Sequence, residues 1–95
     1  MPKQTDLSGA LFGGANLEGA DLTGANMIFA NMAGANLNGA MLNRADLSNA
    51  DLTGAALEGT DFTDANIYGV VFKNVKGLAQ AKGLDHARNR NTAVF

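Results

Sequence analysis

Residues 14–26 read GANLEGADLTGAN, and in this stretch an alanine returns every five residues, at Ala15, Ala20 and Ala25. Each alanine is followed by Asn or Asp and then, in most cases, by leucine. Five residues match neither the 3.6-residue period of an α-helix nor the two-residue alternation of a β-strand. The stretch therefore predicts a repeat architecture rather than an ordinary helix or sheet.

The same five-residue period runs from residue 5 to residue 74. A small residue, alanine in most repeats, stands two positions before each centre, and Asp or Asn lies between the two in ten of the fourteen repeats. Glycine most often closes the repeat. The centre is large and apolar in every repeat, at Leu7, Phe12, Leu17, Leu22, Met27, Met32, Leu37, Leu42, Leu47, Leu52, Leu57, Phe62, Ile67 and Phe72.

This pattern has a physical interpretation as an extended side followed by a corner. Residues two apart on an extended segment face the same way, so the small residue and the centre point inward while the polar residue between them faces water. Glycine or asparagine at the end tolerates the positive φ that a tight corner often needs. Repetition of side and corner winds the chain into coils whose backbones pair at about 4.8 Å per layer.

The A-[D/N]-L-x-G pattern of ANLEG, ADLTG, ANLNG and ADLSN resembles the pentapeptide repeat family. The resemblance implies an all-β solenoid, a right-handed quadrilateral β-helix with one pentapeptide per side and four per coil. Fourteen sides then give about three and a half coils, and residues twenty apart, such as Leu17 and Leu37, stack on each other. We expect an N-terminal tail at residues 1–4, the β-helix at 5–74, and a C-terminal cap and tail at 75–95.

The period stops after residue 74, and the segment that follows has apolar residues at intervals of three. This spacing predicts a short helical cap over the end of the solenoid, interrupted near Gly83, with Asp85 as a candidate helix cap. A lid is expected there because the end of a β-helix exposes apolar core and unpaired edge groups. The apolar residues concerned are Val75, Leu78, Ala81, Leu84 and Ala87.

The net charge of −2 conceals an asymmetry along the chain. Between residues 6 and 72 there are eight acidic residues and one basic residue, Arg44, whereas residues 73–95 carry five basic residues against Asp85 alone. The body is therefore acidic and the C-terminal segment basic, a pattern that bears on partners rather than on fold.

Residues able to carry catalysis or bind a metal are scarce. His86 is the single histidine and there is no cysteine, so a metal or nucleophile cluster lacks partners. The acidic residues sit on the regular lattice of the repeat, which singles out no pair for acid–base chemistry. We expect no enzyme activity, no catalytic residue, no metal, no cofactor and no small-molecule substrate, and we expect the Asp and Asn side chains to bond backbone at the corners.

The departures from the repeat are the candidate functional residues. Ile28 and Phe29 replace outward polar and corner residues, and Leu11 occupies a position usually held by Asp or Asn. On a four-sided map these three residues meet near one edge, and Tyr68 shares the Ile28 column two layers above. They are either scattered surface hydrophobes or a patch for a protein partner or a homodimer.

A rigid solenoid with flat faces and no evident catalyst indicates a structural or protein-interaction module that docks a partner or itself. Many members of the family that the sequence resembles have no assigned activity, and they are abundant in cyanobacteria. The alternative, implied by the quinolone-resistance proteins of that family, is an acidic DNA mimic that binds a type II topoisomerase, gyrase. Its difficulty is length, since about 17 Å of solenoid corresponds to only some five base pairs.

Two further partner classes are disfavoured by composition. Few aromatic residues are present to stack bases, so the composition disfavours direct nucleic-acid binding and predicts that any such binding is weak and salt-sensitive. No apolar run approaches membrane-spanning length, and MPKQT lacks a signal-peptide core, which predicts a cytoplasmic protein with no membrane partner. A processed exported form is the alternative location.

Overall fold

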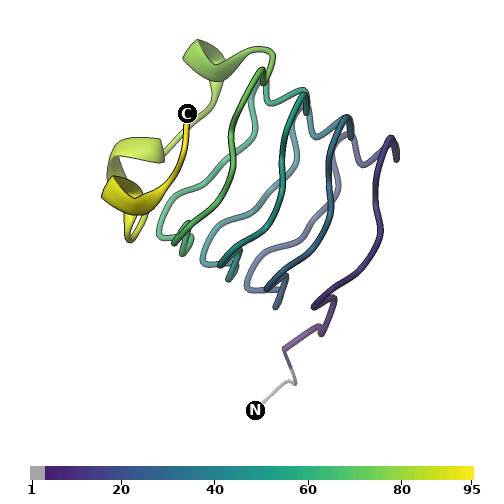
Figure 1. The fold of residues 1–95 in the computed structure, drawn as a ribbon, viewed down its shortest axis with the longest axis vertical. Coiled ribbons are helices and arrows are strands. Elements are labelled where there is room, and N and C mark those ends of the chain that lie inside the picture. Colours follow the sequence, from purple (N-terminus) through teal and green to yellow (C-terminus); the bar gives the residue numbers. More distant parts are fainter. Residues whose placement is uncertain (1–3) are drawn as a thin grey trace.

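The computed structural model describes residues 4–95, so most of the predicted N-terminal tail lies outside the described residues. The chain winds into coils stacked along one axis, from the purple N-terminal coil to the yellow C-terminal segment (Figure 1). Parallel bridges join residues twenty apart, from Asp6 with Asn26 through to Ala56 with Lys76. Because each repeat is five residues long, one coil has four sides.

Backbone hydrogen bonds hold each side to the coil above it. The Leu17 amide donates to the Asn36 carbonyl at 2.8 Å, and the Asn36 amide donates to the Ala15 carbonyl at 2.9 Å. These bonds place Leu17 directly below Leu37, which confirms the predicted stacking of residues twenty apart. Each side supplies one isolated bridge instead of a longer strand, because a turn follows at once.

The turn that ends each side explains the residue at its corner. In one side the Ala20 amide donates to the Leu17 carbonyl at 3.0 Å, closing a four-residue turn whose third residue, Gly19, has a φ of 68°. A positive φ at the third position is the mark of a type II turn and favours glycine or asparagine. The predicted role of the corner residue is therefore confirmed.

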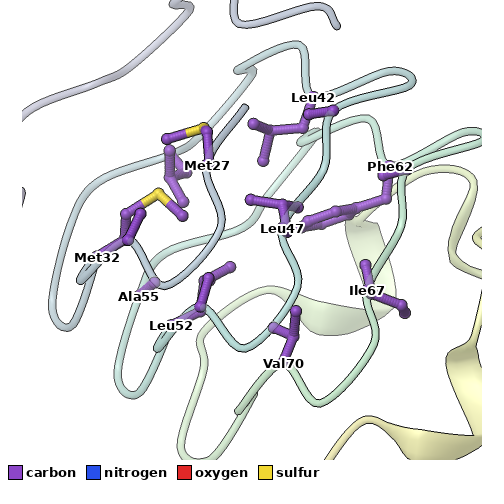
Figure 2. Packing of buried hydrophobic residues seen from close by; sticks show 14 of the residues in the cluster. Met27, Met32, Leu42, Leu47, Leu52, Ala55, Phe62, Ile67 and Val70 are labelled. Carbon is purple, nitrogen blue, oxygen red and sulfur yellow. The ribbon is translucent and has the colours of Figure 1, made fainter. Parts of the chain in front are cut away.

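The interior of the stack is filled by the small residue and the apolar centre of each side. From Ala25 onward the small and central residues are at most 1% exposed through Phe72. Figure 2 shows side chains such as Met27 and Leu47 pointing from successive coils into this common interior. The one polar member, Thr60, donates its hydroxyl to the Leu37 carbonyl at 2.6 Å, so its burial leaves no unsatisfied group.

Three 3₁₀ helices follow the last pentapeptide: η1 (Leu78–Gln80), η2 (Leu84–His86) and η3 (Arg90–Thr92). The sequence predicted short helical turns in this segment, and Gly83 lies between η1 and η2. The prediction of Asp85 as a cap is wrong, because Asp85 lies inside η2 and the N-cap of that helix is Gly83 with a φ of 75° and no side-chain cap bond.

The C-terminal segment also continues the coil, which the sequence analysis missed. Bridges join Asp61 with Lys82, Asn66 with Arg88 and Val71 with Val94, so the separation grows from twenty residues to 21, 22 and 23. Each side here is one residue longer, and a 3₁₀ turn takes up the extra length. The signal in the sequence is the recurrence of VKG, AKG and ARN at intervals of six.

Aromatic stacking fixes the last side onto the interior. The Phe95 ring stacks on the Phe72 ring at a centroid distance of 4.9 Å, and Phe72 meets Phe62 edge to face at 5.7 Å. The Arg90 guanidinium lies 5.5 Å from the centroid of the Phe95 ring. The C-terminal residue Phe95 thus lies against the buried Phe72.

Candidate interaction surface

Three outward apolar residues of the first two coils form the candidate surface, and we call Leu11, Ile28 and Phe29 the corner patch. The side chains of Leu11 and Phe29 are 84% and 67% exposed, and Ile28 is half-buried. Single exposed apolar side chains are common on protein surfaces, but a group of them at one place marks a candidate site for a partner.

The backbone ladder places the corner patch at one corner of the stack. The Gly9 amide donates to the Ile28 carbonyl at 2.8 Å, and Leu11 forms a bridge with Asn31. Ile28 and Phe29 therefore end a side on the second coil, while Leu11 begins the next side on the coil below. The structure brings these three predicted residues together, and their role in binding a partner stays a prediction.

Tyr68, the fourth candidate, stands apart from the corner patch. It shares the outward column of Ile28, but Ser48 lies between them, since Phe29 bonds to the Ser48 carbonyl and Asn49 to the Tyr68 carbonyl. Two layers correspond to about 9.6 Å. The Ser48 hydroxyl is itself bonded to Asp46 at 2.6 Å, so a polar strip separates Tyr68 from the apolar corner.

Phe29 combines its exposure with a backbone conformation that glycine or asparagine adopts more readily. It occupies a corner with a φ of 59°, whereas Gly9, Asn49 and Gly69 occupy the same corner of the other coils. A left-handed conformation costs a non-glycine residue about 1–2 kcal/mol, and a bulky residue there is an outlier. Strain of this kind at an exposed aromatic residue points from structure toward function.

The Asp and Asn side chains that precede the centres fasten the turns. The Asn31 carboxamide oxygen accepts the Ala33 amide at 3.0 Å, and the Asp51 carboxylate accepts both the amide and the hydroxyl of Thr53 at 2.9 and 2.6 Å. The predicted bonding of these side chains to corner backbone is confirmed. The hydroxyl bond, then the amide bond, lowers the pKa of Asp51, so the carboxylate is ionised at neutral pH.

The remaining titratable groups form no cluster in the described residues. Within residues 4–95, no three His, Cys, Asp or Glu side chains lie close enough to hold a metal ion. His86 lies 3.8 Å from Asp85, with the two side chains 73% and 82% exposed, so the pair is a solvated surface contact.

A family model described as pentapeptide repeats matches residues 3–39 and 40–76. The chain belongs to the pentapeptide repeat family. The fold of this family is a right-handed quadrilateral β-helix, in agreement with the four-sided coils joined by parallel bridges twenty residues apart. No curated protein sequence matches the chain.

Solved structures of pentapeptide repeat proteins resemble this one. A pentapeptide repeat protein from the Arabidopsis thaliana thylakoid lumen is 42% identical over 75% of this chain and 49% of its own, with a TM-score of 0.74. Rfr23 from the cyanobacterium Cyanothece 51142 is 27% identical over 100% of this chain and 67% of its own, with a TM-score of 0.61. The chain thus spans about half the length of the plant protein and two thirds of the cyanobacterial one.

Across residues 4–95, none of the helices has the length and apolar character needed to cross a bilayer.

Proposed function

We propose that this pentapeptide repeat protein is a non-catalytic interaction module that docks a protein partner through the corner patch. About three and a half pentapeptide coils form a rigid platform, and the C-terminal segment acts as its lid. The observation that carries the proposal is Phe29, an aromatic residue that is exposed and yet held at a φ of 59°. Exposed aromatic residues flanked by aliphatic ones are typical of binding hot spots.

The apolar corner and its surroundings support one docking mode. Leu11 and Phe29 project from adjacent coils, so a partner side chain can contact the Phe29 ring and the Leu11 methyl groups at once. The neighbouring outward residues are short and polar, among them Ser8 and Asn31, and they give the patch a polar rim. Central apolar contact with a polar rim is the usual anatomy of a protein interface.

The test compares the parent with Phe29→Gly in extracts of the native host, using crosslinking and mass spectrometry. Arg44→Gly is the matched control, because Arg44 is an exposed corner residue with a φ of 58° on a different corner. We expect one protein that crosslinks to the parent and to Arg44→Gly, is lost with Phe29→Gly, and binds the purified parent with at least tenfold higher affinity than it binds Phe29→Gly. Identical crosslinks for all three proteins would refute the corner patch as a docking site.

A second candidate function, the gyrase-binding DNA mimic, is favoured by one observation. The acidic residues of the body occupy outward or corner positions, and hydrogen bonds from Ser8, Thr23, Thr53 and Thr63 lower the pKa of four of the aspartates: Asp6, Asp21, Asp51 and Asp61. These four groups are thus charged at neutral pH, as phosphates are. A DNA mimic must inhibit gyrase supercoiling at near-stoichiometric concentration, and unchanged supercoiling at a large excess would exclude this function.

A further inference from the structure

The two ends of the coil stack differ in how well they are covered. We call residues 5–24 the lower end and residues 75–95 the cap. The four centres of the lower end are half-buried, although the centres directly above them are fully buried. These half-buried centres are Leu7, Phe12, Leu17 and Leu22.

The lower end also has a row of backbone groups without partners. In each bridge the upper residue donates its amide to the coil below, as Asn26 does to the Thr5 carbonyl and Asn31 to the Ala10 carbonyl. Among the bonds within residues 4–95, the corresponding amides of Asp6, Leu11 and Asn16 have no backbone acceptor. Half-covered apolar centres beside such an edge make the lower end a surface that another molecule can cover.

The rim of the lower end is acidic. Asp6, Glu18 and Asp21 are all exposed, and residues 5–24 contain no basic residue. Ser8 holds the Asp6 carboxylate through a hydroxyl bond of 2.7 Å, and the Thr23 amide bonds Asp21 at 3.1 Å. Asp6 and Asp21 are thereby held at the rim, and the three acids lie on three different sides of the coil.

The cap has the opposite character. Its bridge positions carry Lys76, Lys82 and Arg88 on three successive sides, and all three side chains are exposed. Apolar surface accompanies these charges, since Phe95 is 50% exposed and Val94 42%. The half-buried Leu78 and Leu84 of η1 and η2 extend this apolar surface over two further sides.

We propose that the lower end of one copy docks on the cap of a second copy, head to tail. Both surfaces are one coil wide and four-sided, each has an apolar centre, and their rims carry opposite charge. Two lower ends would bring acidic rims together and two caps would bring basic rims together, so the like-end arrangements are repulsive. The head-to-tail contact alone pairs unlike rims.

This proposal concerns surfaces different from the corner patch and does not depend on it. A head-to-tail contact is heterologous, so it adds copies in a line instead of closing a dimer. Since a single coil end is small compared with a standard protein interface, the association is weak and depends on concentration. Because the rims are solvent-exposed, salt weakens it.

The test measures the mass of the purified chain by sedimentation at rising concentration in low salt. We expect the average mass to rise above the single-chain value of 9.8 kDa and to return toward it when salt is added. Asp6→Lys/Asp21→Lys should abolish the rise, and so should Lys76→Glu/Lys82→Glu. Asp6→Lys and Asp21→Lys each remove a turn bond, but Leu11 and Met41 already occupy this position of five-residue sides without one, and all four substituted side chains are exposed, so we expect the fold to persist.

Mixing the two reversed variants distinguishes the proposed contact from a general charge effect. We expect the mixture to associate, and the chain that carries all four substitutions to associate as the parent does. Phe29→Gly is the control, and it should associate normally, which separates this contact from the corner patch. A parent that stays at 9.8 kDa at every concentration, or a mixture that stays apart, would overturn the proposal.

Discussion

Phe29 combines two properties that oppose each other in a folded monomer. Its backbone is in the left-handed region, and its ring is mostly in water, so neither the conformation nor the burial of the side chain stabilises the fold. Asn49, at the same corner of the next coil, and Asn74, at another corner, have similar φ values, but asparagine tolerates this region. The sequence alone identifies Phe29 as an exception to the repeat, and the structure shows that its backbone adopts the strained left-handed conformation.

Replacing Phe29 with glycine should leave stability unchanged or raise it. Relief of left-handed strain is worth about 1–2 kcal/mol, and the greater freedom of glycine in the unfolded chain offsets about 0.5–1 kcal/mol of this. We expect thermal unfolding, followed by circular dichroism, to show the same or a slightly higher midpoint for Phe29→Gly and for Arg44→Gly. A clear loss of stability in Phe29→Gly alone would mean that the ring packs against its own chain.

The aspartates before the centres give the fold a dependence on acid pH. The Thr53 and Thr63 hydroxyls, followed by their amides, lower the pKa of Asp51 and Asp61 below the ordinary value of 3.8. A pKa that is lower in the folded state means that the stabilisation is present above about pH 4 and is lost as the pH falls through the folded-state pKa. The free energy of unfolding of the parent should therefore decrease as the pH falls below about 4.

Asparagine at these two positions should remove part of that dependence. The carboxamide keeps the turn bond, as Asn31 does with the Ala33 amide, but it does not titrate. We expect the unfolding free energy of Asp51→Asn/Asp61→Asn, measured by urea denaturation, to fall less than that of the parent between about pH 4 and pH 2. If the unfolding free energies of the two proteins fell in parallel with pH, the hydrogen bonds from Thr53 and Thr63 would not stabilise the ionised carboxylates of Asp51 and Asp61.

At the scale of the element, the five-residue side was predictable and the six-residue side was not. Every pentapeptide repeats one arrangement of small, polar and large residues, so the five-residue period and the stacking of residues twenty apart could be predicted from the sequence. In the cap the positions after the bridge are Gly77, Gly83 and Asn89, each with positive φ, and the large centre is gone. Without that centre the spacing of three remained visible, while the continuing bridges did not.

The corner patch shows the same division between pattern and packing. The twenty-residue map was enough to bring Leu11, Ile28 and Phe29 to one corner, because it depends only on backbone register. The map could not tell that Ile28 is half-buried, which depends on side-chain packing with neighbouring coils. The map did place Ser48 between Ile28 and Tyr68, but it could not show that the Ser48 hydroxyl is bonded to Asp46.

Substitutions at two glycines can test how closely the cap packs against the coil below it. A Cβ added at Gly83 would lie 2.6 Å from the Thr63 nitrogen and 2.8 Å from its Cα, both of which are backbone atoms. A Cβ at Gly54 would meet only the Gly34 nitrogen at 4.0 Å, so its substitution brings left-handed strain without a clash. The φ values of the two glycines, 75° and 71°, are nearly equal.

We expect Gly54→Ala to lower the unfolding free energy by about 1–2 kcal/mol, from strain alone. Gly83→Ala should lower it clearly more, because the cap must lift away from Thr63 and uncover the apolar interior. Urea denaturation of the two variants gives the comparison. Equal losses would indicate that the cap is not held tightly against the coil at this point.

At the scale of the whole molecule, the two ends of the coil stack differ in charge. Each coil contacts only the coils next to it, so length, charge and end chemistry are separable properties of one scaffold. The acidic lower end and the basic cap are set by outward positions of the repeat, which leave the interior untouched. A chain built this way can change its partners at the surface without altering its core.

This separability predicts that one whole coil can be removed. Deletion of residues 35–54 joins Gly34 to Ala55, keeps the order of the four sides, and leaves the cap on the same sides as before. We expect the shortened chain to fold with a single cooperative transition, with lower stability and a smaller denaturant dependence, because less surface is exposed on unfolding. Circular dichroism during urea denaturation measures both quantities. A shortened chain that shows no cooperative transition would contradict the view that neighbouring coils, rather than contacts across the full stack, specify this fold.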